Sequence, residues 1–450
     1  KRVRIAAVYL AIFPVLAADR IATSYESIRP VLEEMSGQLP AELQAAKPAE
    51  RARAWTAWSG AADTAIRARL EQGDVDSMVN LLLFGTSFTK QPRMTMENLG
   101  AETRAGLLRA RLDDLMAGLA SPGTDERMLL LGKLLQSKEL PPKGAATGAF
   151  ILANLQRVLK ERVAFAARIE TAKARNGASD TYAEHASLFS DRGVSLDTTI
   201  LPNFAIDAAL RELKSRGLLK SKQVARAAVI GPGLDFIDKE AGFDYYPQQT
   251  LQPFAILDSL QRVGLAAESP HLTILDISPR VLEHVKQARD RAGRGQPYVI
   301  QLPRDSADHW TDSAIQYWRD FGSSLGQAID PIAPPATLEH VDARAVRIPA
   351  QTVLSLDSAD LNIVSQRLSL PPAQKFDLIV ATNILVYYGP FEQALALANI
   401  AEMLQPGGFL LTNDELPNVK SVPMRNLGHT SVTYSQTPQQ GDAILWYQRQ

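Results

Sequence analysis

The chain has 450 residues and no cysteine, and its 48 basic and 49 acidic side chains leave a formal net charge of −1. The absence of cysteine excludes disulfides, thiolate metal sites and cysteine nucleophiles. The near-neutral charge favours neither a nucleic acid nor an anionic membrane as a partner. Hydrophobic residues make up 46% of the sequence, which is ordinary for a globular protein long enough to form two or three domains.

The first 18 residues have the layout of a secretory signal peptide. Lys1, Arg2 and Arg4 are basic, and residues 5–18 carry no charge and end in small residues suited to cleavage. The uncharged run is shorter than the roughly 20 residues that a transmembrane helix needs. We therefore predict a signal peptide or anchor over residues 1–18, with an amphipathic first helix as the alternative. No other segment is apolar enough to cross a bilayer.

Residues 19–222 predict an all-α domain. Apolar side chains recur at the spacing of one helix face in two groups, which are Leu108, Leu112, Leu115 and Leu119, and Leu152, Leu155, Leu159 and Val163. The second group lies in a long helix expected over residues 145–174. Pairs such as Pro122-Gly123 and Pro141-Pro142 separate the helices, and a last helix is expected over residues 203–216.

After Lys222, short β-branched runs alternate with helical patterns, which is typical of a parallel sheet with crossover helices. We therefore predict a Rossmann-like α/β domain over residues 223–450, preceded by the all-α domain. The expected strands are 224–230, 272–277, 353–356, 376–382 and 408–412, followed by an antiparallel pair at 431–435 and 443–448. The expected helices are 250–263, 279–292, 359–368 and 390–404. Residues 293–349 are expected to be an irregular insertion with a local helix near 313–321.

The first motif with chemical meaning is Gly231-Pro232-Gly233, which directly follows the strand 224–230. Glycines at this place let the backbone turn tightly and approach a ligand without a side chain in the way. Taken alone, the motif is also compatible with a simple turn.

The second motif is the apolar strand that ends in Asp276. In Rossmann folds that bind a ribose, an acid at this strand end accepts hydrogen bonds from both ribose hydroxyls. A second interpretation is that Asp276 caps the helix that starts near Pro279. The separation between Gly233 and Asp276 is about twice the usual 20 residues, and an insertion over residues 236–250 would account for it.

Two further motifs carry a specific resemblance. The segments FDLIVATNILVYY (376–388) and LQPGGFLLT (404–412) resemble the fourth-strand and fifth-strand signatures of class I S-adenosylmethionine-dependent methyltransferases, especially the chemotaxis-receptor group. The turn Pro406-Gly407-Gly408 is typical of this family and disfavours a nicotinamide-dependent oxidoreductase. The resemblance covers the C-terminal half of the chain only.

The resemblance implies a class I methyltransferase-type sheet and S-adenosylmethionine as the cofactor. By position, Gly231 and Gly233 would flank the methionine part, Asp276 would bind the ribose, Asp357 or Ser358 would lie near the adenine, and Asn383 would lie where the methyl group is transferred. Two residues depart from the family pattern. Val229 replaces the usual acid two residues before the first glycine, and Asp235 replaces the third glycine, where it would either substitute for the missing acid or block the pocket.

Aromatic residues near these motifs offer weaker candidates. The segment 243–249 predicts either a lid or a packed loop. Either Asn383 or a tyrosine such as Tyr245 in this segment could orient the methyl acceptor. His309-Trp310 and Tyr317-Trp318-Arg319 predict either an aromatic wall for a substrate or ordinary packing on the sheet. The six histidines show no metal-binding spacing, so we expect no metal site.

The sequence supports two hypotheses for function. The first is methyl transfer from S-adenosylmethionine to an acceptor that the sequence does not identify. The second is a non-catalytic binding or scaffold protein on a degenerate methyltransferase fold, which would be exported if residues 1–18 are cleaved. Retention of these residues inside the cell would favour the first hypothesis, because the cofactor is expected in the cytosol.

Overall fold

The computed structural model describes residues 19–94, 101–176, 193–195, 198–237, 243–436 and 439–450. The predicted signal peptide over residues 1–18 lies outside the described residues.

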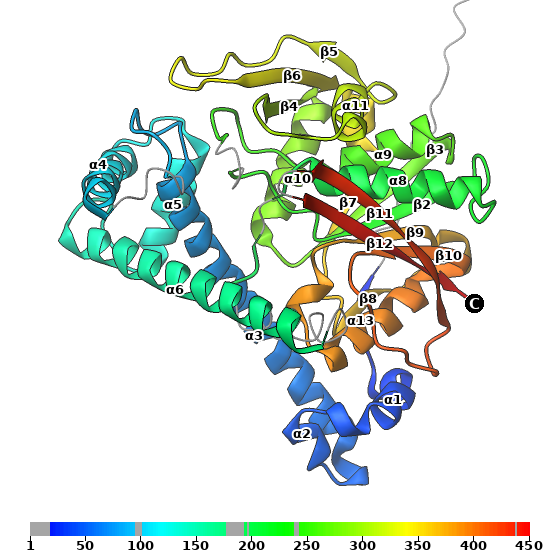
Figure 1. Ribbon diagram of the computed structural model, residues 1–450. Helices are drawn as coiled ribbons and strands as arrows, with labels where there is room; N and C mark the ends of the chain where they lie inside the picture. The colour runs from blue at the N-terminus through cyan, green and yellow to red at the C-terminus, as the bar shows by residue number, and fades with distance from the viewer. Residues whose placement is uncertain (1–18, 95–100, 177–192, 196–197, 238–242, 437–438) are drawn as a thin grey trace, which may run out of the picture.

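A seven-stranded sheet forms the centre of the C-terminal half (Figure 1). Its strands lie in the order β11-β12-β10-β9-β2-β3-β7, and β12 is antiparallel to both of its neighbours while the others are parallel. The chain starts in the middle at β2, moves to one edge, returns beside β2 at β9, and ends with β12 inserted between β10 and β11. This is the class I methyltransferase-type, Rossmann-like sheet that we predicted. The strand bounds are β2 (Val224–Ile230), β3 (Ala266–Asp276), β7 (Leu356–Asp360), β9 (Phe376–Ala381), β10 (Leu404–Thr412), β11 (Met424–Gln436) and β12 (Gln439–Arg449).

Helices cover both faces of this sheet, which explains why the central strands are apolar on both sides. Alternate residues of β2 belong to different cores: Ala227 and Val229 pack with α8 and α9, whereas Ala228 and Ile230 belong to the core that contains α1 and α13. The covering helices are α1 (Tyr25–Glu34), α8 (Leu201–Ser215), α9 (Gln252–Arg262), α10 (Pro279–Gly293) and α13 (Pro390–Met403).

The N-terminal half is helical, as predicted. The C-terminal part of α3 packs with α4, α5 and α6 around a core of their own, which Figure 1 shows as an arm beside the sheet. The bounds are α2 (Ala41–Gln44), α3 (Arg51–Phe84), α4 (Ala101–Ala120), α5 (Glu126–Ser137) and α6 (Ala145–Asn176), with short 3-10 turns at Ser36–Gln38 and Pro48–Glu50. None of the helices in the described ranges is both long and apolar enough to cross a membrane.

The predicted apolar faces of the arm are only partly right. On α4, Leu112, Leu115 and Leu119 are buried as expected. On α6, the buried face is Ile151, Leu155 and Val158, whereas Leu152, Leu159 and Val163 of the predicted face are exposed. Both sets have helical spacing, and the packing of α6 against α3 decides which one is covered.

The first residues of the described chain pack on the C-terminal half. β1 (Arg20–Ala22) pairs antiparallel with β8 (Gln366–Leu368). The indole N–H of Trp55 donates to the carbonyl oxygen of Thr23 at 2.8 Å, and Trp58 packs on Phe391 of α13 with ring centroids 5.2 Å apart. The helical half is therefore anchored to the sheet from its beginning, and the domain boundary at residue 222 stays a prediction.

Residues 293–349 are not irregular, so this prediction is wrong apart from its local helix. They form a second, three-stranded antiparallel sheet in the order β4-β6-β5, with bounds β4 (Tyr298–Asp305), α11 (Asp312–Asp320), β5 (Gln327–Ile329) and β6 (Val341–Ile348). β4 and β6 pair in continuous register from Tyr298↔Ile348 to Asp305↔Val341, across Pro303. Pro331, Pro334 and Pro335 lie in the loop between β5 and β6 and leave the strands intact.

The predicted strand 353–356 and helix 359–368 are also wrong. Residues 350–354 form the helix α12 (Ala350–Leu354), and the third parallel strand is β7, which starts at Leu356. After β7, the Asn362 side chain accepts a hydrogen bond from the Val364 backbone N–H at 3.0 Å. Such a local turn competes with helix formation, and β8 follows. Two short 3-10 turns complete the fold, at Pro372–Gln374 and Leu385–Tyr387.

Candidate ligand-binding site

A cavity opens at the carboxyl ends of β2, β3 and β9. The strand order reverses between β2 and β9, and ligands of open α/β sheets bind at such a reversal. The cavity volume is about 150 Å³, roughly ten times what a single water molecule needs, so the cavity admits a small organic ligand. Four residues that we predicted at a cofactor line it, namely Gly231, Gly233, Asp276 and Asn383.

The glycine turn forms one wall of this cavity. Gly231 and Gly233 have φ angles of 63° and 68°, a left-handed conformation that favours glycine. The Gly231 backbone N–H donates to the Leu275 carbonyl oxygen at 2.9 Å. A Cβ atom on Gly231 would lie 2.3 Å from Cδ1 of Ile384. Both the backbone conformation and the neighbouring side chain therefore require glycine at position 231.

Asp276 is a buried acid with one free oxygen. Its side chain is 4% exposed. Oδ1 accepts a hydrogen bond from the Ser278 backbone N–H at 2.7 Å, whereas Oδ2 is buried without a hydrogen-bond partner. Burial raises the pKa of the Asp276 carboxyl to about 7. Since an unpaired buried acceptor is costly, this oxygen is suited to a ligand that donates hydrogen bonds.

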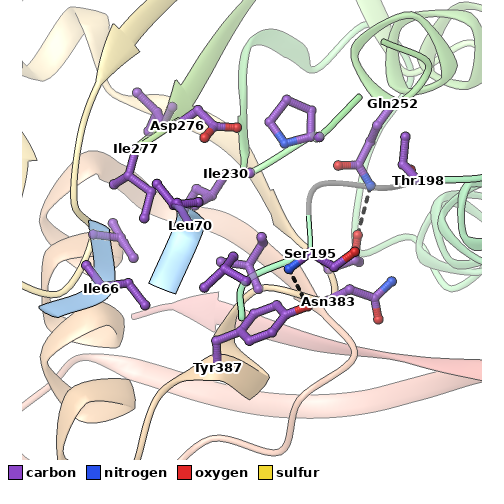
Figure 2. A pocket seen from close by; sticks show the side chains of 18 of the residues that line it. Ile66, Leu70, Ser195, Thr198, Ile230, Gln252, Asp276, Ile277, Asn383 and Tyr387 are labelled. Atoms are coloured by element: carbon purple, nitrogen blue, oxygen red, sulfur yellow. Dashed lines mark hydrogen bonds between the residues drawn. The ribbon is translucent and has the colours of Figure 1, made fainter. Parts of the chain in front are cut away.

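The alternative role of Asp276 as a helix cap is taken by another residue. Ser278 occupies the N-cap position of α10, and its hydroxyl accepts from the Val281 backbone N–H at 3.5 Å. Figure 2 shows Asp276 at one end of the cavity, and Asn383 and Tyr387 at the other end.

Asn383 lies at the mouth of the cavity, directly after β9. It is exposed and has a φ of 59°, which is a left-handed conformation that asparagine adopts more readily than most residues. Its backbone N–H donates to Oδ1 of Asn413 at 2.8 Å, and Nδ2 of Asn413 donates back to Oδ1 of Asn383. Beside it, the buried Gln252 Nε2 donates to Oγ1 of Thr382 at 2.8 Å. The end of β9 thus presents several fixed polar groups.

The helical half completes the cavity. Ile66 and Leu70 of α3 line it, as Figure 2 shows. Between them, Arg67 donates to the Ile277 carbonyl oxygen at 3.0 Å and to Oδ1 of Asp360 at 2.7 Å. Arg67 therefore fixes α3 to the ends of β3 and β7.

A short segment before α8 closes the remaining side. The Val194 backbone N–H donates to the Arg69 carbonyl oxygen at 3.0 Å. The Ser195 backbone N–H donates to the Tyr387 hydroxyl at 3.2 Å, the dashed contact beside Tyr387 in Figure 2. These lining residues were not predicted from the sequence, and nothing in the local spacing of Ile66 or Leu70 distinguishes them from ordinary core positions.

Asp235 and Tyr245 do not line this cavity. Oδ2 of Asp235 accepts from the Tyr246 hydroxyl and from Nε2 of Gln249, each at 2.9 Å. The Asp235 carboxylate therefore neither replaces the missing acid nor blocks the pocket. The Tyr245 ring packs on Phe243 and Tyr246, and burial raises the pKa of its hydroxyl to about 12. The segment 243–246 is a packed loop, which also contacts Leu338 and Val341.

Asp357 and Ser358 do not line the cavity either. The shift of the third strand explains this, because Asp357 and Ser358 lie within β7 rather than after it. Asp357 Oδ2 lies 2.7 Å from Nε2 of His271, and Oδ1 accepts from Arg289 at 3.0 Å. Leu361 and Ile363, which follow β7, line the cavity instead. The predicted position of Asp357 and Ser358 near an adenine is thus not supported by their location.

Within the described residues, no group of three or more histidines and acids is arranged to hold a metal ion.

No protein-family model and no curated protein matches this chain. Among solved structures, the chain is similar to a TehB-like SAM-dependent methyltransferase from Corynebacterium glutamicum, with 11% identity over 55% of this chain and 88% of that chain and a TM-score of 0.26. It is also similar to the mitomycin 7-O-methyltransferase MmcR, with 13% identity over 90% and 100% of the two chains and a TM-score of 0.30. A third similarity is to the citrinin polyketide synthase CMeT domain, with 14% identity over 93% and 94% and a TM-score of 0.28.

Proposed function

We propose that the protein binds S-adenosylmethionine in the cavity at the strand ends and transfers its methyl group to an acceptor substrate. The observation that carries the proposal is the free Oδ2 of Asp276, a buried carboxylate oxygen that lines the cavity across from a glycine turn. A vicinal diol supplies the hydrogen-bond donors that this oxygen lacks, and the ribose of a nucleoside carries such a diol.

The remaining walls fit the rest of such a ligand. Ile66, Leu70 and Ile363 offer an apolar surface for a flat base. Gly231 and Gly233 bring the backbone close to the other end of the ligand without side chains. Asp276 is the only acid among the described lining residues, so the amino-acid end would be held by backbone groups and neutral side chains such as Gln252 and Ser195. This accounts for the absence of an acid at position 229.

S-adenosylmethionine, when bound, would supply a methyl group on a sulfonium centre. Transfer breaks the bond between this methyl carbon and sulfur and forms a bond from the methyl carbon to the nucleophile of the acceptor. The proton of the acceptor is released to water. The protein mainly has to hold donor and acceptor in line. Asn383 lies at the mouth with a fixed side chain, because Asn413 holds its amide oxygen. We assign it the role of orienting the acceptor, while Tyr245 lies too far into its own packed cluster to support the same role.

Calorimetric titration with S-adenosylhomocysteine tests the proposal, with NAD⁺ as the comparison ligand. We expect the wild-type protein to bind S-adenosylhomocysteine and Asp276→Asn to weaken binding by about tenfold or more, since hydrogen bonds to a charged group contribute about 1.5–3 kcal/mol. Asp357→Asn is the matched control, because Asp357 lies on the neighbouring strand outside the cavity. Absence of binding, or equal binding by both variants, would refute the cofactor site and leave the scaffold hypothesis.

A further inference from the structure

A second cavity adjoins the first. The two share Thr198 and Thr199 in their walls. The second cavity is lined by Asp235, Tyr246 and the end of strand β4, including Arg304. Its volume is about 40 Å³, a few times the minimum that a water molecule needs. It therefore has room for a terminal group of a ligand rather than for a whole molecule.

The polar group that stands out in this second cavity is Arg304. Its side chain is 10% exposed and pairs with Asp342, its direct partner on β6. The guanidinium lies between two indoles, with its carbon 5.3 Å from the ring centroid of Trp318 and 5.9 Å from that of Trp310. Its Nε and Nη1 are buried and donate to no acceptor. Arg280 also has two such nitrogens, but it lines neither cavity.

The acids of the second cavity already have donors. Asp235 accepts from Tyr246 and Gln249. Asp305 lies 3.5 Å from Arg93 and accepts from the Ala307 backbone N–H. Asp308 lies in an exposed stretch at the rim. What the cavity lacks is therefore an acceptor for the Nε and Nη1 donors of Arg304, and buried donors without an acceptor are costly.

We infer that Arg304 binds a carboxylate of the methyl acceptor, so that the acceptor is a carboxylic acid whose nucleophile reaches the first cavity past Thr198 and Thr199. This inference rests on the proposed methyl transfer for its meaning, although the binding of a carboxylate can be measured separately. Hydrogen bonds between guanidinium and carboxylate are charge-assisted and therefore strong for their size. Trp310 flanks the cation at the rim and offers a surface on which the body of the acid can pack.

The test uses para-hydroxybenzoate as the probe, with phenol and para-hydroxybenzamide as neutral analogues. Binding is followed by ligand-observed NMR on the full chain, alone and saturated with S-adenosylhomocysteine. We expect the benzoate to bind at least about tenfold more tightly than phenol, and Arg304→Gln to remove most of that difference. The amide distinguishes recognition of a charge from recognition of a carbonyl oxygen. Arg319→Gln, an exposed arginine on α11 that lines neither cavity, is the control with the same change of charge.

A second measurement covers the case in which Arg304→Gln fails to fold. Binding next to Trp310 should change the tryptophan fluorescence of the wild-type protein, and Trp310→Phe should lose that change. Binding that depends on Arg304 or perturbs Trp310 supports the inference. No saturable binding of the benzoate, or equal binding of benzoate and phenol, overturns it. Binding of S-adenosylhomocysteine without binding of the benzoate would support the methyl-donor site and refute only the carboxylate site. Binding of the benzoate without binding of S-adenosylhomocysteine would refute the proposed methyl transfer and support the carboxylate site.

Discussion

The two adjoining cavities differ in the kind of hydrogen-bonding group that lacks a partner. In the first, Asp276 has a buried acceptor oxygen without a donor, and in the second, Arg304 has buried donors without an acceptor. Both groups lie at the ends of strands, Asp276 on β3 and Arg304 on β4. Buried polar atoms without hydrogen-bond partners destabilise a fold, and such atoms on two residues at joined cavities are best explained by ligands that supply the missing partners.

Other charged side chains serve the fold instead of a ligand. Arg262 donates to Asp207 at 2.7 Å, and the partly buried Arg67 joins α3 to the strand ends through the Ile277 carbonyl oxygen and Asp360. Arg262 also has a buried Nε without a hydrogen-bond partner, but neither arginine lines either of the two cavities. An unmet hydrogen bond at a cavity, rather than burial of charge as such, therefore marks a candidate site.

The largest effect is expected from the pH dependence of stability. Burial raises the pKa of Asp276 to about 7, while an aspartate in an unfolded chain titrates near about 3.9. The folded state therefore holds this proton more tightly, and the free energy of unfolding falls as the pH rises from about 4 to about 7. The difference between the two pKa values corresponds to about 4 kcal/mol. Asp276→Asn should flatten this part of the profile and stabilise the protein at pH values above about 7, measured by urea unfolding.

Asp414 provides the control for this prediction. Its Oδ2 is also buried without a partner, and burial raises its pKa to about 7, yet it does not line the first cavity. Asp414→Asn should flatten the profile in the same direction and leave the binding of S-adenosylhomocysteine unchanged. If Asp414→Asn weakened that binding as much as Asp276→Asn, the binding could no longer be assigned to Asp276 in particular.

The glycine turn gives the next largest effect. Gly231→Ala places a Cβ 2.3 Å from Cδ1 of Ile384 in a left-handed backbone conformation, so it should cost about 2–3 kcal/mol and weaken S-adenosylhomocysteine binding. Gly295 has a φ of 78° but open space around it. Gly295→Ala should therefore cost only the conformational strain, about 1 kcal/mol, and leave binding intact. Equal losses in the two variants would show that the contact with Ile384 is unimportant.

Substitutions in α3, which forms one wall of the first cavity, should change the free energy of unfolding by less. The sign of this change should differ between two glycines of the helix. A Cβ on Gly73 would lie 1.9 Å from the carbonyl oxygen of Val194, whereas nothing lies within 4 Å of one on Gly60. Gly73→Ala should therefore displace the segment that carries Ser195, destabilise the protein by about 1–2 kcal/mol and weaken cofactor binding. Gly60→Ala should stabilise it by about 0.5–1 kcal/mol. Thermal unfolding measures both, and a stabilising Gly73→Ala would contradict the contact.

The sequence predicted the parts of the molecule that depend on local pattern. The strands at β2 and β9 are apolar runs that end in a turn, and the residues at their ends, Gly231 and Asn383, line the cavity as their position in the motifs suggested. The last strand pair was also predicted, although β11 and β12 extend further than the expected ranges. These features need no knowledge of distant partners.

The parts that were missed depend on distant partners. β7 has the polar sequence Leu-Asp-Ser-Ala-Asp and is a strand because it pairs with β3 and because His271 and Arg289 contact its Asp357. β4 and β6 need each other across more than thirty residues. The cavity wall from α3 was missed for the same reason, since Ile66 lies far from Asp276 in the sequence. The sequence did not identify Arg304 as a site residue, because its burial depends on the indole rings of Trp310 and Trp318, which come from other parts of the chain.

The smallest change in the free energy of unfolding is expected from a substitution of Arg304 in the second cavity. Arg304 leaves two nitrogens unsatisfied, and its partner Asp342 is 46% exposed, so Arg304→Met should change the free energy of unfolding by less than about 1 kcal/mol. Arg262→Met is the comparison. It would remove the cation that pairs with Asp258 (0% exposed) and one of the two that pair with Asp207 (4% exposed), which keeps Arg211. This variant should cost about 3 kcal/mol or more. Denaturant unfolding of the two variants separates the cases. A loss in Arg304→Met as large as that in Arg262→Met would mean that Arg304 stabilises the fold, and the carboxylate of an acceptor would no longer be needed to explain why it is there.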